Sequence, residues 1–494
     1  MSNQTMIINA AFPEECRVAI LEGQSLEGLF LDTASRTKIV GNLYKGVVTH
    51  IQTSLQAAFV NYGMERNGFL PLSEIHPEYY QQEPSEPLRI QDVLRVGQEV
   101  LIQVVKEEVG TKGALLTTYV SLAGRDVVLM PGQPQRGVSR KIEDETHRER
   151  LKQLAHDLRI PEEFGIIIRT AAEDRTKREV AKDLNNLMKM WEEIKKRVQE
   201  TPSPGLIHQE QDLALRVIRD YFNPNIKTVL VDDRETHQRV KDFLRIIDPR
   251  LQRIVKYHRE DAPISLKYNL EDQIEQVFQK RVPLKSGGYL LIDSTEALVA
   301  VDVNSGRANG DGAVEEMVFK VNMEAATEIP RQLRLRDLGG LVVIDFIDMH
   351  DRRHTREVER RLKEEMKKDK AKITIGRISR FGLLELSRQH LGINTLRSSS
   401  RECPTCKGAG WVRTPLASAL FHLRKIWIGL AQRKDLAQVR GTFSIEVANY
   451  LLNQKRNELK RLEERYGTSI WIEGSPILLP HEGQIEFVSR DGAH

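Results

Sequence analysis

The chain has 494 residues, of which 40% are hydrophobic and 29% are charged, and this length predicts three or more compact globular units. Its 74 basic and 70 acidic residues leave a net charge of +4, so the charge balance neither indicates nor excludes a nucleic acid partner. No apolar run approaches the roughly 20 residues of a transmembrane helix, the first residues lack a signal-peptide pattern, and three cysteines exclude a disulfide framework, so we expect a cytoplasmic protein.

Short β-branched runs separated by turns occupy residues 39–105 and predict a small β-barrel of about five strands. The sequence Gly-Phe-Leu-Pro-Leu-Ser-Glu-Ile at 68–75 and the sequence Val-Gly-Gln-Glu-Val at 96–100 resemble an S1 domain. Such barrels bind single strands by stacking bases on exposed aromatic rings beside cationic side chains. Phe59, Phe69 and Lys112 are the candidates here, and the alternative is that both phenylalanines belong to the barrel core.

Two breaks rich in proline and glycine, at residues 131–137 and 201–205, frame the next region. A buried strand at 165–168 ends in Arg169 and Thr170, whose guanidinium and hydroxyl groups could hold a phosphate. Alternatively, the two residues only end a strand at the solvent. Apolar residues at three- and four-residue steps then predict an amphipathic helix beginning near Lys177, and helical periodicity flanks a strand at 227–232.

Polar side chains end two apolar strands in the second half of the chain. Runs at 289–293 and 297–304 predict a hairpin, and strand alternation places Asp302 and Asn304 on one face. A helix over about 312–334 separates them from an apolar strand, buried on both faces, that reaches Asp345. By alternation Asp345 and Asp348 point to opposite faces, so we expect only Asp345 to join Asp302. Carboxylate and amide oxygens favour Mg²⁺, and the alternative is that these residues cap turns.

Cys403 and Cys406 form a Cys-x-x-Cys turn shaped by proline and glycine, which supplies half of the four ligands of a structural zinc site. The other pair must come from elsewhere in the chain or from a second copy. A redox pair and a metal-free turn are the alternatives. After residue 414 we expect a small α/β unit with a polar helix over 451–466.

Together these motifs resemble the ribonuclease E/G family of bacterial endoribonucleases. The resemblance covers nearly the whole chain, and its motifs occur in the family's order. They are the barrel at 39–105, Arg169-Thr170, Lys-Ser-Gly-Gly-Tyr at 285–289, Val-Asp-Val-Asn at 301–304, Leu-Arg-Leu-Arg-Asp-Leu-Gly-Gly at 333–340, Ile-Asp-Phe-Ile-Asp at 344–348, Arg-Phe-Gly at 380–382 and Cys-Pro-Thr-Cys at 403–406.

The resemblance implies a multidomain fold of the α/β and α+β classes. An S1 barrel (37–120) and a 5′-sensor region (121–211) would interrupt a ribonuclease-H-like subdomain (1–36 and 212–280). A DNase-I-like catalytic subdomain (281–400), a zinc-link (401–414) and a small C-terminal domain (415–494) would follow. Because the chain ends in a folded-looking unit, without a long disordered tail, we expect a member that resembles either ribonuclease G or a short ribonuclease E.

The resemblance also implies roles for individual residues. Asp302, Asn304 and Asp345 would bind catalytic Mg²⁺, and water would hydrolyse single-stranded RNA to leave 5′-phosphate and 3′-hydroxyl ends. Phe59, Phe69 and Lys112 would hold the strand. The 5′-monophosphate sensor would comprise Arg169, Thr170, Gly124, Val128 and Arg140. Cys403 and Cys406 would share one Zn²⁺ with a second chain, giving a homodimer or a dimer of dimers.

The expected function is therefore processing of rRNA and tRNA precursors and decay of mRNA. The alternative, which needs only the barrel, is a non-catalytic RNA-binding factor of the S1 type. A nuclease for DNA is a third hypothesis, because the carboxylates themselves do not distinguish the two sugars.

Overall fold

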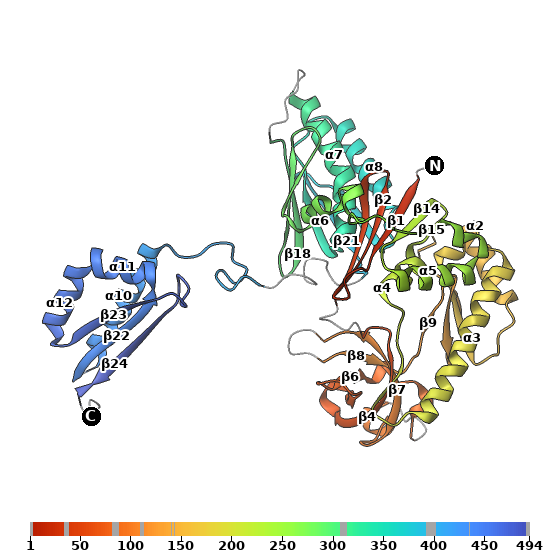
Figure 1. Ribbon diagram of the computed structural model, residues 1–494, viewed down its shortest axis with the longest axis horizontal. Helices are drawn as coiled ribbons and strands as arrows, with labels where there is room; N and C mark the ends of the chain where they lie inside the picture. Colours follow the sequence, from red (N-terminus) through yellow and green to blue (C-terminus); the bar gives the residue numbers. More distant parts are fainter. Residues whose placement is uncertain are drawn as a thin grey trace. The chain divides into compact units, whose positions relative to one another are not determined.

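The computed structural model describes residues 3–33, 39–81, 88–108, 113–139, 141–142, 144–306, 314–391, 402–433 and 435–490. The chain divides into two compact units, residues 1–399 and 400–494, each of which is described by itself. Among the described residues, four sheets belong to the first unit and one to the second (Figure 1). Two predicted binding residues, Lys112 and Arg140, lie outside the described residues.

The N-terminal sheet combines segments that lie far apart in the sequence. Its strand order is β15-β14-β1-β2-β3, and β1 pairs in parallel with β14. The strands are β1 (Gln4–Asn9), β2 (Glu15–Glu22), β3 (Ser25–Thr33), β14 (Ile226–Val231) and β15 (Val255–Tyr257). Alternate side chains of the strands pack into two hydrophobic cores. One core includes α4 (Leu213–Tyr221) and α5 (Arg234–Ile247), and the other includes α6 (Leu270–Phe278). Short 3₁₀ helices, η5 (Pro249–Ile254) and η6 (Leu266–Tyr268), complete this region.

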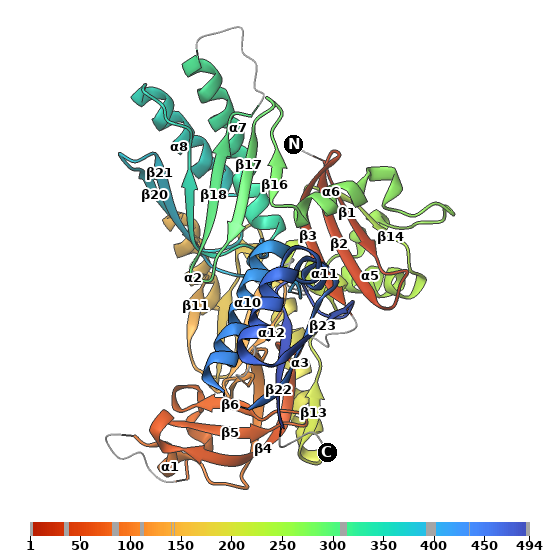
Figure 2. The same ribbon diagram turned by 90° about the vertical axis from the view of Figure 1, so that its left-hand side faces the viewer.

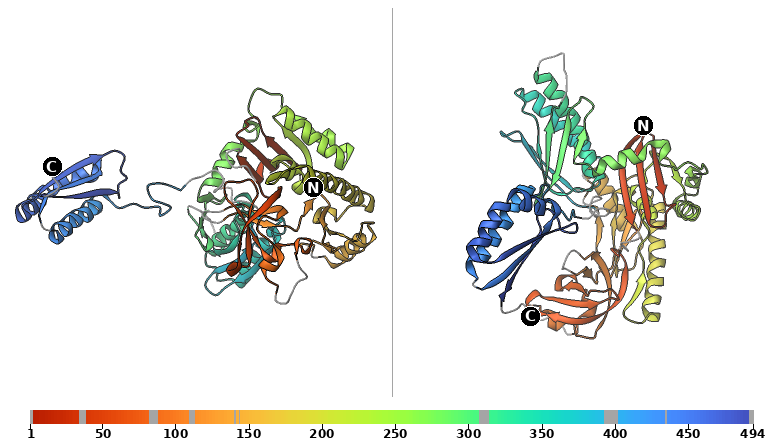
Figure 3. Two further views of the ribbon diagram at one scale, coloured as in Figure 1. Left: turned by 90° about the horizontal axis from the view of Figure 1, so that it is seen from below. Right: turned by 60° about the vertical axis from the view of Figure 1, so that its left-hand side comes forward.

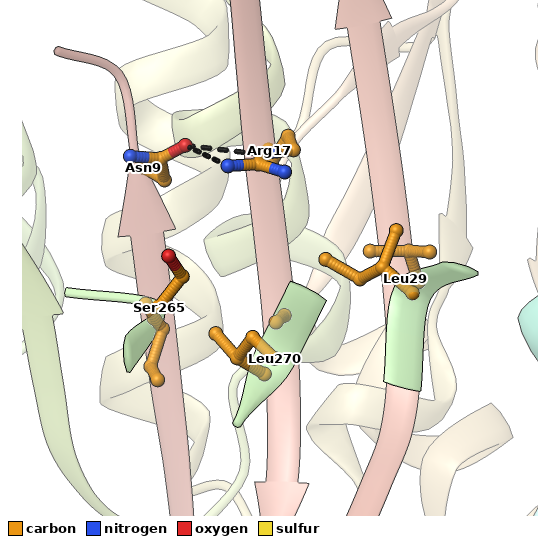
Figure 4. A pocket seen from close by; sticks show the side chains of 8 residues that line it. Asn9, Arg17, Leu29, Ser265 and Leu270 are labelled. Carbon is orange, nitrogen blue, oxygen red and sulfur yellow. Dashed lines mark hydrogen bonds between the residues drawn. The ribbon is translucent and has the colours of Figure 1, made fainter. Parts of the chain in front are cut away.

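A small cavity in this sheet lies between β1, β2 and α6 (Figure 4). Arg17 on β2 closes one side of it by donating two hydrogen bonds to Asn9 Oδ1 on β1, at 3.0 and 2.8 Å. The cavity volume is about 10 Å³, which is the space of a single water molecule. This cavity is therefore too small to bind a substrate.

Residues 43–117 form the predicted barrel, and this prediction is confirmed. The strands are β4 (Leu43–Gln52), β5 (Ala57–Asn61), β6 (Gly68–Pro71), β7 (Glu99–Lys106) and β8 (Leu115–Thr117). Pairing of β4 with β7 closes the sheet, and β13 (Gly205–His208) adds a strand outside β4. Four short helices lie between the strands: η1 (Thr53–Leu55), η2 (Leu72–Glu74), η3 (Pro77–Tyr79) and α1 (Ile90–Val93).

The third sheet has the order β11-β12-β10-β9. Its elements are β9 (Leu122–Ala123), β10 (Val127–Pro131), β11 (Arg136–Val138), α2 (Glu145–Asp157), β12 (Phe164–Ile168), η4 (Thr170–Ala172) and α3 (Lys177–Glu200). The predicted start of the long helix is confirmed. Thr176 is the N-cap residue that precedes Lys177, and it forms a reciprocal capping box with Glu179 in the first turn. Leu184, Leu187 and Ile194 of this helix are buried against the sheet.

The fourth sheet has six strands in the order β16-β17-β18-β19-β21-β20, in which only β18 and β19 run parallel. These are β16 (Arg281–Pro283), β17 (Tyr289–Ser294), β18 (Leu298–Asn304), β19 (Gly340–Asp345), β20 (Ile373–Ile378) and β21 (Leu383–Arg388). Helices α7 (Val314–Leu335) and α8 (Arg352–Met366) pack with one face of the sheet (Figure 2). The predicted hairpin and intervening helix are confirmed, and α7 continues through Pro330.

The prediction that the strand ending at Asp345 is buried on both faces is wrong. Val342 and Ile344 of β19 are fully buried under the helices, whereas Leu341 is 46% exposed and Val343 is only partly buried. Because α7 and α8 cover only one face, the other face of the sheet is open to solvent among the described residues.

The C-terminal unit is a three-stranded sheet with helices on one side (Figure 3). Its elements are α10 (Pro415–Gln432), β22 (Leu436–Ser444), α11 (Ile445–Gln454), α12 (Arg456–Tyr466), β23 (Ser469–Ser475) and β24 (Gly483–Ser489). The predicted α/β unit is therefore present, but the prediction of a single helix over 451–466 is wrong. Lys455 adopts φ −114° and ψ 16°, which ends α11 and lets α12 bury a separate pair of leucines, Leu459 and Leu462.

Candidate active site

Asp302 and Asp345 lie next to each other on neighbouring strands. In the parallel pairing of β18 with β19, Asp302 stands opposite Asp345. Asn304 lies on the same face as Asp302, and its side-chain amide donates a hydrogen bond to Asp302 Oδ2 at 2.8 Å. The structure thus brings the three predicted side chains together at the end of the sheet where both strands stop.

Asp348 also faces this group, contrary to the alternation that placed it on the opposite side. Alternation holds only within a strand, and β19 ends at Asp345, so the chain has turned by the time it reaches Asp348. Burial raises the pKa of Asp345, and the negative charges of Asp302 and Asp348 raise it further. Two carboxylates, Asp302 and Asp348, therefore act on Asp345 where only Asp302 was expected.

The turn between β20 and β21 forms one side of the carboxylate group. Gly382 in this turn has φ +78°, a conformation that suits glycine. A methyl group at this position would lie 3.2 Å from Asp348 Oδ1 and 4.0 Å from Asp345 Oδ1. The backbone of the turn also accepts a hydrogen bond from Phe346 N at Gly382 O, at 3.4 Å. The turn is thus tied directly to the segment that carries Asp345 and Asp348.

The side-chain oxygens of Asp302, Asn304 and Asp345 fit Mg²⁺ better than a metal ion whose ligands must all come from the protein. Mg²⁺ is usually held by one or two carboxylates, with water and substrate phosphate completing its octahedron. Within the part of the chain that the structure describes, no three or more His, Cys, Asp or Glu side chains form a ready metal-binding group. Asp302 and Asp345, with the amide oxygen of Asn304, supply the partial ligand set that Mg²⁺ accepts.

Phe59 and Phe69 form a pair on the barrel surface. They stand opposite each other on β5 and β6, with ring centroids 5.9 Å apart and planes at 65°. Both are partly exposed, which excludes the alternative that both are core residues. His50 extends the group, because its ring centroid lies 6.1 Å from that of Phe59. The sequence did not indicate His50, because the pairing of β4 with β5 shifts register between Val48 and His50. Strand alternation alone does not predict such a shift.

Arg169 and Gly124 are also brought together. One nitrogen of the Arg169 guanidinium donates to Gly124 O, and another contacts Asp220 Oδ1 at 2.7 Å. Thr170 follows in an exposed position at the start of η4, and Val128 lies on β10 opposite Ile167. Asp220 was not predicted, because it lies on α4, 51 residues away in the sequence.

Asp220 lies in a partly exposed polar cluster that reaches the sheet of β16–β21. Its carboxylate also accepts hydrogen bonds from Arg219, at 3.1 and 3.2 Å, and these guanidinium partners hold its pKa below the ordinary value despite burial. Lys370, which lies just before β20, donates to the Asp220 carbonyl and stacks on the Tyr221 ring at 4.2 Å. Burial lowers the pKa of Lys370 to about 8. The segment holding Arg169 is therefore in contact with the sheet that carries Asp345.

Cys403 and Cys406 form a tight turn. Lys407 N donates to Cys403 O and Ala409 N to Cys406 O, each at 2.8 Å. Backbone N–H groups of Cys406 and Thr405 lower the pKa of Cys403, which favours the thiolate form that binds metal. The third cysteine, Cys16, belongs to β2 of the other unit, where burial raises its pKa to about 12. Cys16 is partly buried against the core of the N-terminal sheet, and it belongs to no Cys-x-x-Cys turn.

Comparison with known families assigns three segments of the chain. Residues 121–391 match the model of the Ribonuclease E/G family. Residues 37–118 match the S1 RNA binding domain, and residues 402–488 match the thioredoxin-like domain of RNase E/G. No helix among the described residues is both long enough and apolar enough to cross a membrane.

Curated relatives cover nearly the whole chain. It is 45% identical over 492 residues to ribonuclease E of Haemophilus influenzae, a match that spans 99% of this chain and 52% of the relative. It is 46% identical over 464 residues to ribonuclease E of Escherichia coli, spanning 93% and 44%. With ribonuclease G of Escherichia coli it shares 34% identity over 477 residues, spanning 96% and 97%. The chain thus spans about half the length of the ribonuclease E relatives.

Proposed function

Because the chain belongs to the Ribonuclease E/G family, we propose that it is an endoribonuclease that cleaves single-stranded RNA at the Asp302–Asp345 group. The observation that carries this proposal is the pairing of the two aspartates in register at the ends of β18 and β19. The proposed substrates are precursors of rRNA and tRNA and the 5′-monophosphorylated intermediates of mRNA decay.

Hydrolysis at this group would leave a 5′-phosphate and a 3′-hydroxyl. The water oxygen bonds to phosphorus, the bond between phosphorus and the 3′ oxygen breaks, and that oxygen takes up a proton. Asp302, Asn304 and Asp345 would hold Mg²⁺, which, when bound, neutralises phosphate charge and orients the attacking water. Asn304 has a second task, because its amide donates to Asp302 Oδ2 and holds that carboxylate in place.

The barrel would hold the strand during cleavage. Phe59 and Phe69 present two ring faces at a wide angle, and each stacked base contributes roughly 1–3 kcal/mol. Lys112, which lies outside the described residues, would add a phosphate contact. Phosphate contacts of this kind weaken as salt rises, because binding releases counterions.

The 5′ end of the substrate would be recognised around Arg169. A terminal monophosphate would bind the Arg169 guanidinium and the exposed Thr170 hydroxyl, near Gly124 and Val128, with Arg140 as a further cation. The ion pair with Asp220 supports this role, because it fixes the direction of the guanidinium before substrate arrives. Contact of Lys370 with Asp220 offers a physical route from this segment to the catalytic sheet.

Zinc would join two copies of the chain. A structural Zn²⁺ needs four ligands, and each chain would supply two thiolates, from Cys403 and Cys406. The lowered pKa of Cys403 and the partly buried position of Cys16 against the N-terminal sheet support a site completed by a second copy. We therefore propose a zinc-linked homodimer, or a dimer of dimers built from it.

Replacing both aspartates by asparagine, Asp302→Asn with Asp345→Asn, should reduce RNA cleavage by at least 100-fold (~3 kcal/mol). Affinity for the same RNA should change by less than about threefold, because the barrel is untouched. Cleavage is measured on a defined single-stranded RNA with and without Mg²⁺, and affinity by fluorescence anisotropy. A variant that cleaves at the wild-type rate would contradict the proposed function.

Removing the guanidinium in Arg169→Ala should slow cleavage of 5′-monophosphorylated RNA about tenfold, the loss of one charge-assisted phosphate contact. Cleavage of the same RNA carrying a 5′-triphosphate should change little. The rate ratio of the two substrates measures this effect, with Arg245→Ala as a control because Arg245 forms an exposed ion pair with Asp242 on α5, outside the proposed sensor. Equal losses on both substrates would instead indicate a general role in folding or binding.

The double variant Cys403→Ala with Cys406→Ala should bind no zinc and should be monomeric at concentrations where the wild type is dimeric. Cys16→Ala is the matched control and should retain both properties. Metal content and light scattering provide the readouts. A zinc-free variant that remains a stable dimer would refute the zinc link.

A further inference from the structure

A single row of side chains crosses the open face of the six-stranded sheet through the carboxylates. Register pairs Arg281 with Leu291, Leu291 with Asp302, Asp302 with Asp345, and Asp345 with Leu383. Leu291 and both aspartates lie exposed on the face that α7 and α8 do not cover. A strand of RNA cleaved at Asp302 and Asp345 must therefore lie across this face.

An arginine and an aromatic ring lie together at one end of the row. The Arg281 guanidinium carbon is 3.9 Å from the centroid of the Tyr289 ring. Tyr289 stands opposite Asn304, so this pair directly adjoins the carboxylate group. Gly306 lies close beside the ring, since a methyl group added there would lie 3.2 Å from Tyr289 Cδ1. Tyr289 thus packs against Arg281 and Gly306 with part of its surface open to solvent.

A second arginine and ring lie at the other end, in the turn before Leu383. Phe381 is 69% exposed, and the Arg380 guanidinium carbon is 4.8 Å from its ring centroid. The turn is rigid: Gly382 N donates to Ser379 O at 3.1 Å and Phe381 N to Ser379 Oγ at 3.2 Å. Phe381 is therefore an exposed aromatic ring in a tight turn whose next residue, Gly382, lies beside Asp345 and Asp348.

Charge explains why arginines accompany both rings. The clustered carboxylates repel an RNA phosphate, and a guanidinium on each side offsets that repulsion while donating to phosphate oxygens. An aromatic ring beside a guanidinium is the combination that binds single-stranded nucleic acid, because every base has a face that can stack. Strands lie about 4.8 Å apart, so β17 and β21, three spacings apart, are separated by about 14 Å, with the aspartates between them.

We propose that the pairs Arg281–Tyr289 and Arg380–Phe381 are two nucleotide subsites that flank the cleaved phosphodiester, and that Phe381 stacks on the base at one side of the bond. This inference rests on the proposed function and adds the residues that place the scissile bond over Asp302 and Asp345. Tyr289 holds the base on the opposite side.

The test compares Phe381→Ala with Phe381→Trp on a set of short RNAs, each lacking one base at a successive position around the cleavage site. On intact RNA, Phe381→Ala should lower kcat/KM roughly 5- to 100-fold, the loss expected for one stacked base, whereas Phe381→Trp should remain near the wild type. The wild type should show a similar loss at one abasic position adjoining the bond. Phe381→Ala should show no further loss at that position.

Matched controls separate this effect from a general change at the surface. Phe12 is 68% exposed in the turn between β1 and β2, so Phe12→Ala removes an equally exposed ring and should leave cleavage unchanged. Tyr289→Ala should become insensitive to an abasic site on the other side of the bond. Tyr289→Phe keeps the ring and should retain the wild-type pattern.

Two different failures are distinguishable. In the first, the wild type cleaves RNA but Phe381→Ala cleaves at the same rate, or its rate falls equally at every abasic position. The subsites are then wrong, and the endoribonuclease proposal stands. The subsites are equally wrong if Phe381→Ala changes the oligomeric state without changing cleavage, because the ring then contacts a second copy. If the wild type cleaves none of the RNAs, the proposed function fails, and these subsites fail with it.

Discussion

The register of the parallel pairing between β18 and β19 is the constraint on which the proposed site depends. It places Asp302 directly opposite Asp345, and β-strand periodicity places Asn304 on the same face. A slip by one residue would turn one set of side chains into the core under α7 and α8. Val301 and Ile344, the neighbours of the aspartates, are buried there, so the hydrophobic core opposes such a slip and thereby holds two like charges together.

Burial raises the pKa of Asp345, the negative charges of Asp302 and Asp348 raise it further, and a bound cation would offset those charges. The same sheet also explains how substrate reaches the aspartates, because its helices cover only one face. In the proposed function, other parts of the first unit would contribute at a distance: the Phe59–Phe69 surface would hold the strand, and Arg169 would hold its end. The contacts of Asp220 with Lys370 and with Arg169 join the Arg169 segment to the sheet that carries Asp345.

Local periodicity predicted the barrel, the hairpin, the helix α3 and the position of Asp302 and Asn304 on one face of their strand. It failed at Asp348, where the strand had already ended, and on the exposed face of β19, because burial depends on which faces the helices cover. Contacts distant in sequence carried no local signal: β1 with β14, β4 with β13, and Arg169 with Asp220. The family motifs supplied the roles of individual residues, which stay predictions, and Lys112 and Arg140 lie outside the described residues.

The most direct test of a cation site between Asp302 and Asp345 is anomalous diffraction from crystals grown with Mn²⁺, which replaces Mg²⁺ and can be located by its scattering. We expect one Mn²⁺ bound by the carboxylates of both aspartates, and its loss in Asp345→Asn. Mn²⁺ bound only at a site that involves neither aspartate would contradict a cation site at this pair.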